Sequence, residues 1–110
     1  MQIVHHAHLN AQQHDGEQIV TAADATLGVH GFEVRVHRLA PGAHGAELRH
    51  AGELVVVVLA GCGKLLLDGA PQHFAAPCTV QLPPRRCAQF VNHGSEPLLL
   101  VAVRAGHGPS

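Results

Sequence analysis

One apolar run constrains the fold of this chain more than any other feature. The segment Leu54-Val-Val-Val-Val-Leu59 contains only aliphatic residues, most of them β-branched. Successive side chains of a β-strand point to opposite faces, so the run predicts a strand that is apolar on both faces. Similar short runs occur at 65–67 and 98–101. Inside a barrel one face fills the interior, and the other face then needs a second covering layer.

Turn signals divide the chain into short extended segments. They stand at Pro41-Gly42, Gly61-Cys62-Gly63, Asp68-Gly69, Pro83-Pro84 and Asn92-His93-Gly94. Short strands at regular spacing predict an all-β fold, an antiparallel barrel or sandwich, and no stretch fits a helix of three turns. We expect one domain over residues 1–110. The expected extended segments are 18–21, 31–39, 46–50, 54–59, 64–68, 72–74, 79–82, 87–91 and 97–103.

Two features lie before the apolar run. Residues 1–17 are polar and rich in turn residues, which predicts an arm, with a short strand at Met1–Val4. Residues 22–25 suit a single helical turn. From Gly31 to Leu39 the residues alternate, with Phe32, Val34 and Val36 on one face and Glu33, Arg35 and His37 on the other. This alternation predicts a half-buried strand.

Composition excludes several functions. Hydrophobic residues make up 46% of the chain and aromatic residues 3%, so the core is aliphatic and base-stacking surfaces are not expected. Charged residues make up 14% and the net charge is −1, which argues against binding to a nucleic-acid backbone. Cys62, Cys78 and Cys87 form no CxxC pair, and neither a signal peptide nor a membrane span is visible. We therefore expect free thiols and a cytoplasmic protein without a membrane partner.

Two spacing patterns resemble the motifs of the cupin superfamily, whose members are small double-stranded β-helix (jelly-roll) barrels. The first, G-x5-H-x-H-x3-E-x6-G, keeps its frame at Gly42, Leu48, His50, Leu54 and Gly61. The second, G-x5-P-x-G-x2-H-x3-N, keeps its frame at Pro77, Pro83, Arg85, Ala88 and Asn92. The resemblance covers about residues 30–103, and it implies the barrel fold.

The resemblance also implies where a metal would bind. Cupins hold one divalent metal with two His, a Glu and a third His, and those positions are Leu48, His50, Leu54 and Ala88 here. Hydrocarbon side chains have no lone pair to donate, and one imidazole falls short of the three or four protein ligands of a zinc or iron site. The motif therefore predicts no metal cofactor at these positions.

The leading hypothesis is a non-catalytic cupin that binds a small molecule. Leu48, His50 and Leu54 occupy positions that face inward in the family. One imidazole in an apolar wall would form a pocket with a single polar handle, as ligand pockets often do. Besides His50, the predicted ligand-binding residues are Leu48, Leu54, Val56, Ala88 and Phe90.

Other uses of the chemistry-bearing residues remain open. A metal-dependent enzyme of the dioxygenase, isomerase or epimerase type would need non-family ligands. Such ligands could come from His30, His37, His44 and His50, or from His50 with Glu53, although strand parity opposes the latter. An exposed tail is the simplest interpretation of His5, His6 and His8, although such a cluster also suits adventitious metal.

Further expectations concern the residues of two turns. Arg85 and Arg86 suit either a solvated turn or a site for carboxylate or phosphate, and their charge near Cys87 is suggestive of an activated thiol. Asn92 should cap its own turn, because Asn often does so before Gly.

The runs that are apolar on both faces predict a homodimer through outer sheet faces, unless the N-terminal arm covers that face. A third hypothesis is an inert interaction protein with a filled barrel.

Overall fold

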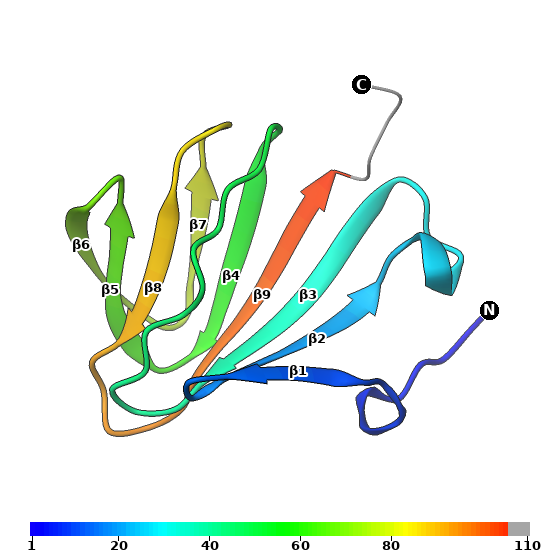
Figure 1. Cartoon of the computed structure of the whole chain (residues 1–110), viewed down its shortest axis with the longest axis horizontal. Helices are drawn as coiled ribbons and strands as arrows, with labels where there is room; N and C mark the ends of the chain where they lie inside the picture. Colours follow the sequence, from blue (N-terminus) through cyan, green and yellow to red (C-terminus); the bar gives the residue numbers. More distant parts are fainter. Residues whose placement is uncertain (106–110) are drawn as a thin grey trace.

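The structure, a computed structural model, describes residues 1–105 and folds them almost entirely into antiparallel strands (Figure 1). Helical segments in this part of the chain are two short 3-10 turns, η1 (His6–His8) and η2 (Ala25–Leu27). The strands are β1 (Ala11–His14), β2 (Glu17–Ala23), β3 (Phe32–Leu39), β4 (Leu54–Ala60), β5 (Cys62–Leu67), β6 (Ala70–Ala75), β7 (Cys78–Leu82), β8 (Ala88–Asn92) and β9 (Leu98–Ala105).

The strands form two sheets. The large sheet has the order β1-β2-β3-β9-β4-β7, and the small sheet has the order β6-β5-β8. Residues 40–53 run beside β8, where the bridges His44–Val91 and Leu48–Ala88 make them an irregular extension of the small sheet (Figure 1). Together the sheets form an all-β barrel of the predicted jelly-roll type.

The apolar run at 54–59 forms the central strand β4, which lies between β9 and β7. Leu54, Val56 and Val58 are buried in the barrel, whereas Val55 and Val57 on the other face are half-buried. Phe90 meets the barrel-facing side chains and packs edge-on against Phe74, with ring centroids 5.5 Å apart. The interior is therefore filled by aliphatic side chains around one aromatic pair.

Strand β3 alternates as predicted, but its polar face is the one turned into the barrel. His37 is 2% exposed and Leu39 is fully buried, whereas Phe32 on the opposite face is 47% exposed. Alternation shows that two faces differ in polarity but not which face is enclosed. The sequence therefore predicted a half-buried strand without assigning its inner face, and Glu33 and Arg35 share the inner side with His37.

The N-terminal arm also differs from the prediction. No strand forms at Met1–Val4, and the arm instead contributes β1, which pairs with β2 of the same chain at the edge of the large sheet. The helical turn expected at 22–25 lies slightly later, because β2 continues to Ala23. Asp24 then caps η2 by accepting hydrogen bonds from the backbone N–H groups of Thr26 and Leu27.

Several predicted turns are confirmed. Asp68 and Gly69 both have positive φ and connect β5 to β6 as a tight hairpin. Asn92 accepts the Gly94 N–H through Oδ1 at 2.8 Å, which is the expected cap, and its amide also donates to the Leu39 carbonyl. The tail beyond Ala105 lies outside the described residues. Within the described residues, no helix has the length and apolar character needed to span a membrane.

Candidate functional site

A small cavity lies at one end of the barrel, where β3 and β4 begin and β9 ends. We call this end the barrel mouth; it is the upper end in Figure 1. The cavity has a volume of about 80 Å³, roughly that of two or three water molecules. Its wall combines charged, polar and aliphatic side chains: Arg35, His37, Glu47, Leu48, Arg49, Leu54, Ala102 and Arg104.

Strand register brings these residues together from distant parts of the sequence. Arg35 of β3 pairs with Ala102 of β9, and Arg104 of β9 pairs with Leu54 of β4. His37 also belongs to β3, and the other three wall residues belong to 40–53, the segment that runs beside β8. Three strands and one irregular segment therefore enclose a volume that no single sequence motif covers.

His37 and Glu17 form a buried pair in the cavity wall. Nδ1 of His37 lies 3.1 Å from Oε2 of Glu17, and the two side chains are 2% and 5% exposed. Because an ionised carboxylate can only accept, Nδ1–H is the donor. Glu17 accepts a second hydrogen bond at Oε1 from the backbone N–H of Ala46, at 2.8 Å. The Glu17 carboxylate is therefore satisfied at both oxygens, and it fixes the orientation of the imidazole.

The other ring nitrogen of His37 is the unusual atom of this site. Nε2 is buried and has no hydrogen-bond partner among the described residues. In a neutral imidazole whose Nδ1 carries the proton, Nε2 is an acceptor. An unpaired buried polar atom costs about 1–3 kcal/mol. A ligand group that donates to Nε2 would remove this cost.

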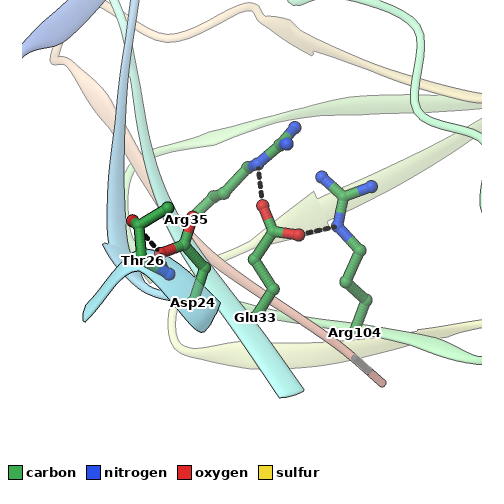
Figure 2. A network of polar contacts seen from close by, with 5 residues as sticks. All are labelled: Asp24, Thr26, Glu33, Arg35 and Arg104. Atoms are coloured by element: carbon green, nitrogen blue, oxygen red, sulfur yellow. Dashed lines mark hydrogen bonds and ion pairs between the residues drawn. The ribbon is translucent and has the colours of Figure 1, made fainter. Parts of the chain in front are cut away.

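The outer part of the mouth contains a charged cluster of one glutamate and two arginines (Figure 2). Glu33 lies between them, with Oε1 2.6 Å from Nε of Arg35 and Oε2 3.6 Å from Nε of Arg104. Burial lowers the pKa of the Arg104 guanidinium, and the positive charge of Arg35 lowers it further, while Glu33 opposes both effects. The cluster therefore holds two cations with one shared counter-ion.

The predicted ligand-binding residues are divided between this cavity and the core. Leu48 and Leu54 line the cavity. Val56, Ala88 and Phe90 lie in the buried core cluster. His50 is half-buried outside the cavity lining, and its Nδ1 accepts the Gly52 N–H at 3.1 Å. The cavity thus has an imidazole handle beside leucine side chains, but the imidazole belongs to His37.

The family metal positions do not suit a metal ion. Leu48 and Ala88 face each other across a backbone bridge, and Leu54 completes a hydrocarbon surface with no donor atom. Among residues 1–105, no three His, Cys, Asp or Glu side chains are arranged to hold a metal. His30 and His44 are exposed, away from buried His37, and Glu53 is exposed as parity predicted.

The other candidate residues have structural contacts. Arg86 pairs with the carboxylate of Asp68, so the anion it binds here belongs to the protein itself. Arg85 has a φ of 64°, in the left-handed region, at the position of a glycine in the second cupin motif. Cys87 is half-buried and donates its backbone N–H to Asp68 at 3.0 Å. All three cysteines are free, as expected.

Sequence reasoning missed Glu17, Glu33 and the cavity arginines. A signal was present for Arg104, since it is the only charged residue in the otherwise apolar strand β9 of a chain with few charges. Three of the seven Lys and Arg residues line this one cavity. The low overall charge concealed a local concentration at the barrel mouth.

Comparison with solved structures shows the same fold in several proteins. The polyketide cyclase RemF from Streptomyces resistomycificus superposes with a TM-score of 0.79 at 19% identity, over 100% of this chain and 82% of its own. A predicted oxalate decarboxylase from Thermotoga maritima gives 0.79 at 15% identity, over 96% of this chain and 100% of its own. A Cupin 2 conserved barrel domain protein from Salinispora arenicola gives 0.74 at 25%, over 94% and 85%.

Sequence comparison identifies the family. Curated proteins give no match to the sequence. The family model described as "Cupin domain", however, matches residues 35–104. These residues run from Arg35 to Arg104, and they include both motif frames and the whole cavity wall. Because the match extends over more than half of the sequence, the chain belongs to the cupin family.

Proposed function

We propose that this cupin binds a small organic molecule in the cavity at the barrel mouth, without using the family metal positions. The observation that carries the proposal is the unpaired Nε2 of His37, a buried acceptor in the wall of a cavity. An unpaired buried polar atom destabilises the folded protein, and a ligand that donates a hydrogen bond to it would offset this free energy. Buried aliphatic side chains pack together below the mouth, and the proposal places the ligand at the mouth, beside His37.

A cavity-filling variant tests this proposal. Ala102 is 4% exposed and lines the cavity, so Ala102→Leu would occupy the volume that a ligand needs. Ala105→Leu adds the same side chain at an exposed position of the same strand and serves as the control. The measurement is the change in melting temperature with a panel of small neutral, anionic and cationic compounds.

We expect at least one compound class to raise the melting temperature of the wild type and of Ala105→Leu, but not of Ala102→Leu. Ligand binding to the native state alone gives such a shift by mass action. If every compound shifts the melting temperature of Ala102→Leu as much as that of the wild type and Ala105→Leu, the proposed function is wrong. The inert interaction protein would then be the better description.

The same imidazole favours a second candidate function, proton transfer to and from a bound ligand. A carboxylate that orients Nδ1–H leaves Nε2 free to act as a general base. The test is proton NMR of candidate ligands in deuterated buffer. Loss of a carbon-bound proton signal with the wild type, but not with Ala102→Leu, would show catalysis. Unchanged spectra for ligands that bind would leave binding as the function.

We also propose that the protein is a homodimer through the outer face of the large sheet. Val36, Val101 and Val57 lie in one row across β3, β9 and β4, and each is half-buried in the single chain. Val34, Val103 and Val55 form the adjacent row. A second copy would cover this apolar face through a two-fold axis. In the single chain, the N-terminal strand β1 instead extends the sheet edge.

A further inference from the structure

We propose that the ligand is a small α-hydroxy carboxylate, bound by the guanidinium groups of Arg35 and Arg104 and by Nε2 of His37. This inference rests on the proposed function and gives the chemical class of its ligand. The carboxylate would lie against the two arginines. The adjacent hydroxyl would donate to the imidazole.

The arginine pair supplies the anion specificity. Within the described residues, Glu33 contacts both guanidinium groups through their Nε atoms. Figure 2 shows the terminal nitrogens of both groups on the side away from that carboxylate. Each guanidinium therefore keeps donors for a second acceptor. The planar fork of arginine matches a carboxylate with two parallel hydrogen bonds.

The arginine pair of the mouth also favours an anion. The cavity wall contains three arginines and one glutamate, Glu47, and two further carboxylates lie beside it: Glu33, which is shared by two of the arginines, and Glu17, which contacts His37. After burial, the positive charge of Arg35 is the second cause that lowers the pKa of the Arg104 guanidinium. A ligand carboxylate would relieve this repulsion. A cationic ligand would increase it.

The hydroxyl requirement comes from His37. Because Glu17 accepts from Nδ1–H, the buried Nε2 presents a lone pair and needs a donor. A carboxylate alone cannot donate a hydrogen bond. Arg35 and His37 are two residues apart on the same face of β3, about 7 Å along the strand. A carboxylate and its neighbouring hydroxyl, with one hydrogen bond at each end, span about this distance.

The volume limits ligand size. About 80 Å³ holds a fragment of about five or six non-hydrogen atoms. Glycolate has the required groups within this size. Acetate lacks the hydroxyl, glycolamide lacks the charge, and inorganic phosphate is an oxoanion of similar size. These four compounds separate the features of the proposed ligand.

Titration calorimetry with these four compounds tests the proposal. We expect the wild type to bind glycolate about tenfold or more tightly than acetate or glycolamide, because each lacks one charged or buried hydrogen bond. Arg104→Gln and Arg35→Gln should each weaken glycolate binding by about tenfold or more. Arg38→Gln should leave it unchanged, because Arg38 is exposed on the opposite face of the same strand.

Glu17→Gln tests the role of His37. A glutamine amide can donate to Nδ1, which moves the ring proton to Nε2 and removes its acceptor character. We expect the preference for glycolate over acetate to shrink in this variant, because Nε2–H can then donate to a carboxylate oxygen as well as to a hydroxyl oxygen. Arg104→Gln should weaken glycolate binding in this variant as it does in the wild type. A preference for glycolate that is unchanged from the wild type would show that the protonation of Nε2 does not govern binding of the hydroxyl.

The outcomes separate this inference from the proposed function. If no compound binds, and the broad panel shows no difference for Ala102→Leu, both fail. If glycolamide binds at least as tightly as glycolate and Ala102→Leu abolishes it, the cavity binds a ligand but the carboxylate assignment is wrong. If phosphate binds as tightly as glycolate, the ligand is not specifically a hydroxy acid, and the site binds oxoanions in general. If Arg38→Gln and Arg104→Gln weaken glycolate binding equally, Arg35 and Arg104 are not the residues that bind the carboxylate.

Discussion

Glu17 joins two parts of the barrel that are far apart in sequence. One oxygen contacts His37 of β3, and the other accepts from Ala46, in the segment beside β8. The contact therefore links the large sheet to the irregular edge of the small sheet. Replacing a side chain that satisfies one buried and one partly buried donor is costly, because both donors lose their partner.

We expect Glu17→Ala to lower the free energy of unfolding by about 2–4 kcal/mol, since it leaves the Ala46 N–H and the imidazole unpaired. Glu17→Gln keeps an acceptor for the Ala46 N–H, so its free energy of unfolding should fall by less. Urea unfolding measures both, with Glu96→Ala at an exposed position as the control. Similar losses for Glu17→Ala and Glu96→Ala would mean that the buried pair does not stabilise the barrel.

Gly45 allows the close approach of this segment to Glu17. A Cβ at Gly45 would lie 3.0 Å from Oε2 of Glu17 and 3.2 Å from the backbone oxygen of Phe90. The backbone oxygen cannot move away easily, so we expect Gly45→Ala to lower the unfolding free energy by about 1–3 kcal/mol. Gly31→Ala is the control, because no atom lies within 4 Å of its added Cβ. Equal melting temperatures for the two variants would contradict this.

At the scale of the strand, the sequence predicted position better than orientation. The apolar run, the Asp68-Gly69 hairpin and the paired motif spacing were sufficient to predict an all-β barrel of the cupin type, because turns and alternation are local properties. The inner face of β3 was not predictable in this way. The adjacent strand β9 and the next strand β4 have apolar residues on both faces, so hydrophobicity did not distinguish inside from outside.

The candidate site was less predictable than the fold for the same reason. Motif positions led to His50, and the motif identified Leu48 and Leu54, which do line the cavity. The imidazole that lines it lies in another strand. Its partner Glu17 is twenty residues earlier in the sequence, and no local pattern connects the two. Such pairs are set by register between strands.

The turn before β8 contains a conformational strain that substitution can relieve. Arg85 has a φ of 64°, where a Cβ costs about 1 kcal/mol or more. We expect Arg85→Gly to be about 0.5–1 kcal/mol more stable than Arg85→Ala, because both lose the same exposed side chain and only glycine removes the strain. Urea unfolding of the two variants is the measurement. Greater stability of the alanine variant would contradict the left-handed assignment.

Asp68 makes the hairpin between β5 and β6 sensitive to acid. The Cys87 N–H and the Arg86 guanidinium lower the pKa of its carboxyl group. The charged form therefore stabilises the native state above about pH 4, and this contribution is lost as the pH falls through the lowered pKa. Asp68→Asn should lower the melting temperature at pH 7, with the difference shrinking toward pH 3.

The matched control for this titration is Asp15→Asn, which also lies in an Asp-Gly turn with positive φ. Asp15 is exposed and contacts His14 alone among the charged groups of the described residues. Its replacement should change the melting temperature at pH 7 less than Asp68→Asn does. A difference for Asp68→Asn that is constant from pH 7 to pH 3 would exclude the charge as its cause.

For the whole molecule, the two valine rows predict the oligomeric state. Val101 is central, with Val36 and Val57 as its cross-strand neighbours. We expect the wild type to sediment with about twice the chain mass of 11.6 kDa, and Val101→Lys to sediment as a monomer. His73→Lys, at an exposed position of β6 in the small sheet, should remain dimeric. A monomeric wild type at micromolar concentration would exclude the dimer.

The inward polar face of β3 has a consequence for how this barrel can change over evolution. Along that one face, aliphatic Leu39 lies deep in the barrel and charged Glu33 and Arg35 lie at the mouth. Apart from the His37–Glu17 pair, residues that determine folding stability are thus separated along the barrel axis from those that would select a ligand. Substitutions at the mouth can alter recognition while the deeper packing stays intact. During evolution, such a protein could therefore change the kind of ligand it binds while every intermediate sequence still folds.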